Sequence, residues 1–223
     1  MEGPGTRVRN IRKTLPLSSD QGKNFRAAFQ RGFRAAEKGS HKAAADREAQ
    51  ERWSAYCSDQ AVCELLLGDV ARTLPYAQRA AELQHSLWQT KQGDPGCRTR
   101  VIGAYVALGA FQLINGDAHA AAQTARRALE VTPASLKCKA VLTLGLLGDG
   151  QLSEAREILR DHCASQACPG RTFPDALRDY VHLRCQKGRL HADQERVEAL
   201  IQEVMGAASS PPPAPNSGRS GGL

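Results

Sequence analysis

Apolar side chains recur along the middle of the chain with the spacing of amphipathic helices. Val101, Tyr105 and Leu108 lie three or four residues apart ahead of Gly116. Such spacing predicts a helix, and the glycine after it favours a tight turn. A similar arrangement recurs around Gly150, where helical spacing resumes after the glycine. The pattern therefore predicts helices that are joined in pairs by short turns.

The two glycine turns belong to an internal repeat. Residues 116–121 have a counterpart in residues 150–155, an offset of 34 residues, and Leu108 matches Leu142 at the same offset. A fixed period of this length is typical of proteins built from stacked copies of one small helical unit.

A helix–turn–helix unit of 34 residues resembles the tetratricopeptide repeat, whose pattern is W-x2-L-G-x2-Y, then A-x3-F, then P. Residues 102–135 fit this pattern best. The matching positions are Tyr105 for the Trp, Leu108 and Gly109, Ala121, and Pro133. Gln112 and Ala125 stand at the two further aromatic positions. The next unit, 136–169, fits less closely and has Lys139 where the first aromatic belongs.

Weaker units flank this pair, at 25–54, 54–87 and 174–206. The resemblance implies an all-α fold, a right-handed superhelix of about four to five stacked helix-turn-helix repeats. We expect this domain to span residues 21–206. Residues 1–20 are expected to form a basic disordered arm, and the Ser/Pro/Gly-rich residues 207–223 a disordered tail.

Two stretches fit the period poorly. Residues 93–96, Gly-Asp-Pro-Gly, are a strong turn signal within an extra segment that is expected to lengthen one helix and its connection. Residues 41–67 contain neither Gly nor Pro, so one long helix and two helices both remain open there.

Composition narrows the class of protein. The seven cysteines include no C-x-x-C pair and are too scattered over 223 residues to form a disulfide framework. The longest uncharged apolar stretch, Val101–Ile114, is shorter than the ~20 residues of a membrane helix, and no secretory signal begins the chain. We expect a soluble protein of the cytosol or nucleus.

No catalytic signature is found in the sequence, so we expect neither an enzyme nor a cofactor. The glycine-rich residues 145–150 lack a following Lys and are interpreted as a repeat turn rather than a phosphate loop. Cysteine and histidine side chains near residues 162–185 have spacings that match no zinc module, so we expect no metal there. Whether the following residues meet in space remains open: Cys163, Cys168, His182 and Cys185.

The net charge of +7 is concentrated at the N-terminus, because residues 1–50 carry 11 basic and 5 acidic side chains. A solvated basic face is the simplest interpretation, and binding of RNA or another polyanion is the alternative function. The residues that would carry it are Arg7, Arg9, Arg12, Lys13, Arg31, Arg34, Lys38 and Lys42.

The resemblance also implies a binding surface. In this family the first helix of each pair lines a concave groove that binds peptides. Carried over by register, the groove residues are Val106, Ala110, Leu113, Lys137, Ala140, Leu144, Arg178 and His182. Some family members bind a chaperone's C-terminal carboxylate with Lys and Asn. Val106 and Ala110 stand at those positions in the best unit, so we expect no carboxylate clamp.

These observations predict a non-catalytic adaptor or scaffold that binds a segment of an unidentified protein partner in this groove. Self-association or a neighbouring helix could instead fill the apolar groove positions. The repeat pattern assigns Leu142 to the core and Leu144 to the groove, which makes the two leucines a test of the register.

Overall fold

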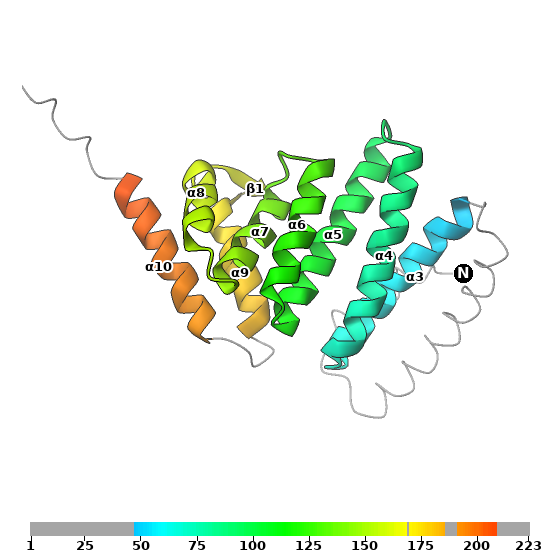
Figure 1. Cartoon of the computed structure of the whole chain (residues 1–223), viewed down its shortest axis with the longest axis horizontal. Coiled ribbons are helices and arrows are strands. Elements are labelled where there is room, and N and C mark those ends of the chain that lie inside the picture. The colour runs from blue at the N-terminus through cyan, green and yellow to red at the C-terminus, as the bar shows by residue number, and fades with distance from the viewer. Residues whose placement is uncertain (1–46, 169, 186–190, 209–223) are drawn as a thin grey trace, which may run out of the picture.

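Eight helices follow one another in the part of the chain that the structure, a computed structural model, describes: residues 47–168, 170–185 and 191–208. They extend from α3 at one end of the molecule to α10 at the other, with α7, α8 and α9 overlapping in the view next to α10 (Figure 1). The helices are α3 (Arg47–Leu66), α4 (Val70–Thr90), α5 (Pro95–Asn115), α6 (Ala118–Val131), α7 (Leu136–Gly148), α8 (Leu152–His162), α9 (Phe173–Cys185) and α10 (His191–Ala208). Consecutive helices pack against each other, which confirms the all-α fold of stacked helix–turn–helix pairs.

Three of the helix pairs are joined by the same turn. Gly68, Gly116 and Gly150 adopt φ values of 82°, 88° and 80°, in the left-handed region where only glycine is unstrained. At each turn the glycine N–H donates to a carbonyl three residues back, and the next N–H donates to one five residues back. This double hydrogen bond is the Schellman motif, which closes a helix C-terminus. The sequence identified Gly116 and Gly150 correctly as turns, and the weaker unit upstream has the same turn at Gly68.

A capping residue follows directly in these turns and starts the second helix. The Asp69 carboxylate accepts from the Arg72 N–H at 3.2 Å, and the Asp117 carboxylate accepts from the Ala120 N–H at 3.0 Å. Each bond satisfies a backbone donor that would otherwise be unpaired at a helix N-terminus. Gln151 stands at this position in the third pair and makes no such bond.

The two helices on either side of the expected extra segment are long. Helices α4 and α5 have 21 residues each, and Asp94 caps α5 with Pro95 at its first position. The extra segment expected here therefore lengthens both helices. Helix α3 is continuous from Arg47 to Leu66, so the described part of 41–67 is one helix, and the unit boundary expected at residue 54 is wrong.

One element was not expected from the sequence. A short antiparallel hairpin of β1 (Gln166–Cys168) and β2 (Arg171–Thr172) connects α8 to α9. Helix α10 extends to Ala208, two residues into the expected tail. The expected arm at 1–20, the rest of residues 1–46, and residues 209–223 lie outside the described residues.

Alanine and glycine set the distance between the stacked pairs. Ala121 and Ala155, the repeated alanines, are fully buried. Gly145 lies inside α7, and a Cβ there would be 2.7 Å from the Ala122 backbone nitrogen on α6. The interpretation of 145–150 as a turn is therefore correct only for its last residues, because α7 continues to Gly148.

Candidate functional site

The face of α5 that the repeat register assigns to the groove is partly open. Val106 and Ala110 are half-buried, as are Ile102 and Ala107 beside them, and Gly103 is exposed. Val106 packs against the margins of two hydrophobic core clusters, one centred on α7, α9 and α10 and one on α4 and α5. Ile102, Val106, Ala107 and Ala110 thus form an apolar, half-buried surface, which we call the α5 face. Two of them, Val106 and Ala110, are predicted groove residues.

The corresponding residues of the next pair are buried. Ala140 and Leu144 on α7 are 0% and 3% exposed, and Leu113 near the end of α5 is 1% exposed. All three belong to the core cluster that includes Leu177 on α9 and Ile201 on α10. They are packed inside the protein itself, which corrects the expectation that their side chains are open to a partner.

Helix α7 is buried because it has neighbours on every side. It contacts α5, α6, α8, α9 and α10, and residues 140–147 contain no charged side chain. A helix that is apolar all round is typical of a core position. Leu142, at 5% exposure, is no more buried than Leu144, so the two leucines do not separate core from groove.

The polar residues expected at the groove edges differ in their surroundings. Lys137 is exposed. Arg178 on α9 is half-buried, and its Nε lies 2.9 Å from a Glu198 carboxylate oxygen on α10. This hydrogen bond, with a further contribution from Asp175, raises the pKa of Arg178. Arg178 thus joins α9 to α10 rather than presenting a free charge, and the side chain of His182 lies outside the described part.

A cavity of about 320 Å³ lies beside Arg178, between α9, α10 and β2. The arginines that line it are compensated: Arg171 pairs with Asp179 at 3.2 Å, and Arg178 pairs with Glu198. Arginines that are already paired with carboxylates leave little net positive potential to select an anion.

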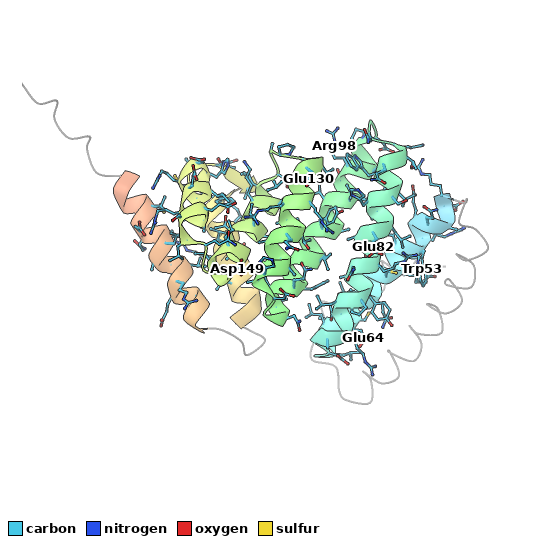
Figure 2. All side chains as sticks on the ribbon, in the orientation of Figure 1. Trp53, Glu64, Glu82, Arg98, Glu130 and Asp149 are labelled. Carbon is cyan, nitrogen blue, oxygen red and sulfur yellow. The ribbon has the colours of Figure 1, made fainter. Side chains whose placement is uncertain are left out.

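A second hollow lies on the opposite side of α5. Tyr105, Leu108 and Gln112 form its floor, about half a helical turn around from the α5 face. Helix α4, which carries Glu82 (Figure 2), forms one bank, and α6 forms the other. We call this the α4–α6 cleft; its volume is about 180 Å³. The residues on the two banks are Gln78, Ala81 and Glu82 on α4 and Ala120, Gln123, Thr124 and Arg127 on α6.

This cleft was not expected from the sequence, although one of its residues departs from the repeat pattern. Gln112 stands where the repeat pattern has an aromatic residue, and its Oε1 is buried with no hydrogen-bond partner among the described residues. A missing ring at a repeat position is the signal that could have indicated a hollow there.

His162 at the end of α8 has a pKa that its surroundings perturb. Its Nε2 lies 2.7 Å from Lys139 Nζ on α7, and its ring packs edge-on against Phe173. Burial lowers the pKa of His162, and the Lys139 charge lowers it further. The lysine that replaces an aromatic in this repeat is thus hydrogen-bonded to a neutral imidazole.

The structure describes few of the residues of the other candidate sites. All eight cations proposed for polyanion binding precede residue 47 and lie outside the described residues. Within the described residues, no group of three or more His, Cys, Asp or Glu side chains could hold a metal ion. Cys163 is half-buried with a free thiol, and the side chains of Cys168, His182 and Cys185 are not described. Among the described helices, none has both the length and the apolar character needed to cross a membrane.

The structure therefore defines a helical-repeat protein whose stacked hairpins are tetratricopeptide-like. No family model and no curated protein matches the sequence. A solved structure, of the MamA RS-1 ArsTM double mutant, aligns over 95% of this chain and 99% of its own, with 16% sequence identity and a TM-score of 0.42. At that identity and TM-score the likeness assigns no function.

Proposed function

We propose that this chain is a non-catalytic adaptor that binds a short segment of another protein on the α5 face. The observation that carries the proposal is the run of half-buried apolar side chains along one side of α5, from Ile102 to Ala110. A surface of this kind suits the apolar side of a partner's helix or strand. Each apolar anchor that it buries would contribute about 1–2 kcal/mol.

The charge near this surface favours binding of a short partner segment over binding of a large apolar partner. Lys137 near the start of α7 is exposed, and the repeat register assigns it to a cationic edge of the apolar strip. Polar rims around a small apolar centre are typical of interfaces between separately folded proteins.

A photo-crosslinking amino acid at position 106 tests this proposal in cells that express the full chain. We expect it to capture a defined protein, and we expect Val106→Glu to abolish binding of that protein in a purified assay. Leu152→Glu is the matched control, because Leu152 is a large apolar residue, 48% exposed, on α8. Capture of nothing above background, or equal loss of binding in both variants, would exclude the α5 face as the binding surface.

Polyanion binding remains a second candidate because residues 1–50 carry +6 of the net charge. Replacement of the eight N-terminal cations by serine in the full chain should abolish binding of single-stranded RNA. Binding by the unaltered protein should also weaken steeply with added salt, since phosphate contacts release counterions. RNA binding that resists salt and survives the replacement would exclude these cations as its source.

A further inference from the structure

The two ends of the helix stack differ in what their outer sides carry. Helix α10, the last described helix, presents polar side chains to solvent, among them Gln194, Glu195 and Gln202. A polar outer side is typical of the unit that closes a stack of repeats. Helix α3, at the other end of the described molecule (Figure 1), instead carries Gln60 and Cys63, which are 0% and 1% exposed.

The buried cysteine lies on the side of α3 away from α4. Helix α3 packs on α4 through Ala61 and through Ser54, whose hydroxyl donates to a carbonyl of α4 at 3.3 Å. Cys63 follows Ala61 by two residues, which is about 200° around the helix. Tyr56 and Gln60 precede Cys63 by seven and three residues and so lie on the same stripe. We call Tyr56, Gln60 and Cys63 the outer α3 face.

The described residues do not account for the burial of this face. Cys63 belongs to none of the apolar clusters that they form. Gln60 donates to the Glu64 carboxylate on its own helix, at 2.7 Å. Burial raises the pKa of the Cys63 thiol to about 12, with smaller contributions from the charges of Asp59 and Glu64. What covers the outer α3 face therefore lies outside the described residues.

The N-terminal segment is the part of the chain best placed to cover it. Residues 1–46 lead directly into α3, which begins at Arg47. Residues 209–223 follow α10, at the opposite end of the molecule from α3 (Figure 1), and Leu223 is their one large apolar residue. Residues 186–190 connect α9 to α10.

Residues 25–38 have the pattern of an amphipathic helix and contain no proline. Phe25, Phe29 and Phe33 recur every four residues, so they form a ridge on one side of such a helix. The cations of this segment are spaced by three and four residues and fall on the opposite side: Arg31, Arg34 and Lys38.

We propose that residues 25–38 form a helix that docks its phenylalanine ridge on the outer α3 face and turns its cations to solvent. Docking removes aromatic rings from water, whereas burial of an unpaired cation would be unfavourable. The cationic side then closes the stack at the α3 end, as the polar side of α10 does at the other. The docking depends neither on the α5 face nor on polyanion binding.

The chain length between the two helices sets a register for the docking. Residues 39–46 are long enough to return the chain antiparallel, as short helix–helix connections do. A return about the midpoint of this connection places Phe29 opposite Tyr56 and Phe25 opposite Gln60.

A photo-crosslinker tests the docking in the purified full chain. Benzoylphenylalanine at position 29 should form crosslinks within one chain to the tryptic peptide 53–72, which lies between Arg52 and Arg72 and contains the outer α3 face. The same group at position 34 is the matched control, and it should form no crosslink to this peptide because it lies on the cationic side. Equal crosslinking from both positions, or crosslinks from position 29 only to other peptides, would exclude the docking.

The reactivity of Cys63 toward iodoacetamide gives a second test, read by peptide mass spectrometry. Phe29→Glu should raise the alkylation rate of Cys63 on the order of ten-fold or more, because the thiol becomes accessible and its pKa returns toward the ordinary value. Cys138, buried in the core beside α5, should stay protected and reports that the fold is intact. Arg34→Glu is the control variant and should leave Cys63 protected.

Two further results would overturn the proposal. Protection of both Cys63 and Cys138 in Phe29→Glu would exclude the phenylalanine ridge as the cover of the outer α3 face. Crosslinks from position 29 that join two chains, together with a dimer in solution, would assign that face to a second copy of this chain. The crosslinking result stands by itself where Phe29→Glu makes Cys138 reactive too, since the crosslinker retains a ring at position 29.

Discussion

Helices α5 and α7 occupy equivalent positions in successive units of one repeat, yet they have different surroundings. Val106 corresponds to Ala140 at the 34-residue offset, and Ala110 corresponds to Leu144. The two residues on α5 are half-buried, whereas the two on α7 are fully buried. Equivalent repeat positions therefore do not have equivalent exposure.

The difference comes from what packs against each helix. Helices α9 and α10 contribute Leu177, Val181, Ile201 and Val204 to the core around α7. The α5 face meets the margin of that core at Val106 and is only partly covered. In stacked repeats each unit contacts mainly its neighbours, so the position of a unit in the stack determines which of its faces stays open.

The largest expected difference in stability is between a variant with a charge in α7 and a variant with a charge in α5. Leu144→Glu puts a carboxylate in the core without a partner and should cost about 3–5 kcal/mol of unfolding free energy. The melting temperature should fall by roughly 10 °C or more. Val106→Glu leaves its carboxylate at a half-exposed position and should cost less than about 1 kcal/mol.

Thermal unfolding followed by circular dichroism compares the two variants directly. Equal melting temperatures for Leu144→Glu and Val106→Glu would mean that the two helices are equally open or equally closed. Leu142→Glu serves as a core reference and should behave like Leu144→Glu.

A smaller effect is expected from one methyl group on each helix. Gly145→Ala would place a Cβ 2.7 Å from the Ala122 nitrogen and 3.0 Å from the Ala118 carbonyl oxygen on α6, which are backbone atoms. We expect a loss of about 1–3 kcal/mol from this overpacking. Gly103→Ala meets nothing within 4 Å and should stabilise the helix by about 0.5–1 kcal/mol.

Urea denaturation measures both glycine variants on one scale. We expect changes of opposite sign in the free energy of unfolding, with Gly145→Ala less stable and Gly103→Ala more stable than the unaltered chain. A stabilising Gly145→Ala would show that α6 and α7 are not in close contact at this residue.

The smallest expected effect is on the pH dependence of stability, and it arises from His162 on α8 beside Lys139 on α7. Because burial and Lys139 lower the pKa of His162, the folded protein binds this proton less readily than the unfolded chain does. Stability should therefore decrease as pH falls from the ordinary pKa of 6.5 toward the lowered value. His162→Gln should remove this part of the pH dependence, measured as melting temperature between pH 7 and pH 5. An unchanged profile in that variant would contradict the assignment to His162.

The local features of the fold could be predicted from the sequence. Gly116, Gly150 and the alanines at 121 and 155 are determined by backbone conformation and by contacts close along the chain. Gly68 lies within the weak unit 54–87, and the long α4 and α5 separate its turn from Gly116 by more than the 34-residue period. The hairpin β1–β2 is too short to produce an alternating pattern.

The candidate site could be predicted only in part, for a physical reason. The register placed Val106 and Ala110 on a partly open face of α5. The burial of Leu113, Ala140 and Leu144 depends on α9 and α10, which are distant in sequence. Apolar positions on a helix look the same whether a partner or another helix of the same chain covers them. The α4–α6 cleft depends on Gln112 together with small residues on two other helices. No local sequence pattern predicts such a combination.

Solvent accessibility at individual methyl groups tests the central claim, that α5 is open where α7 is closed. Val106 and Leu144 methyl signals of the full chain are recorded with increasing amounts of a soluble, uncharged paramagnetic gadolinium chelate. We expect strong relaxation enhancement at the Val106 methyls and little at the methyls of Leu144 and Leu142. Equal enhancement at Val106 and Leu144 would contradict it, because the two helices would then present the same face to solvent.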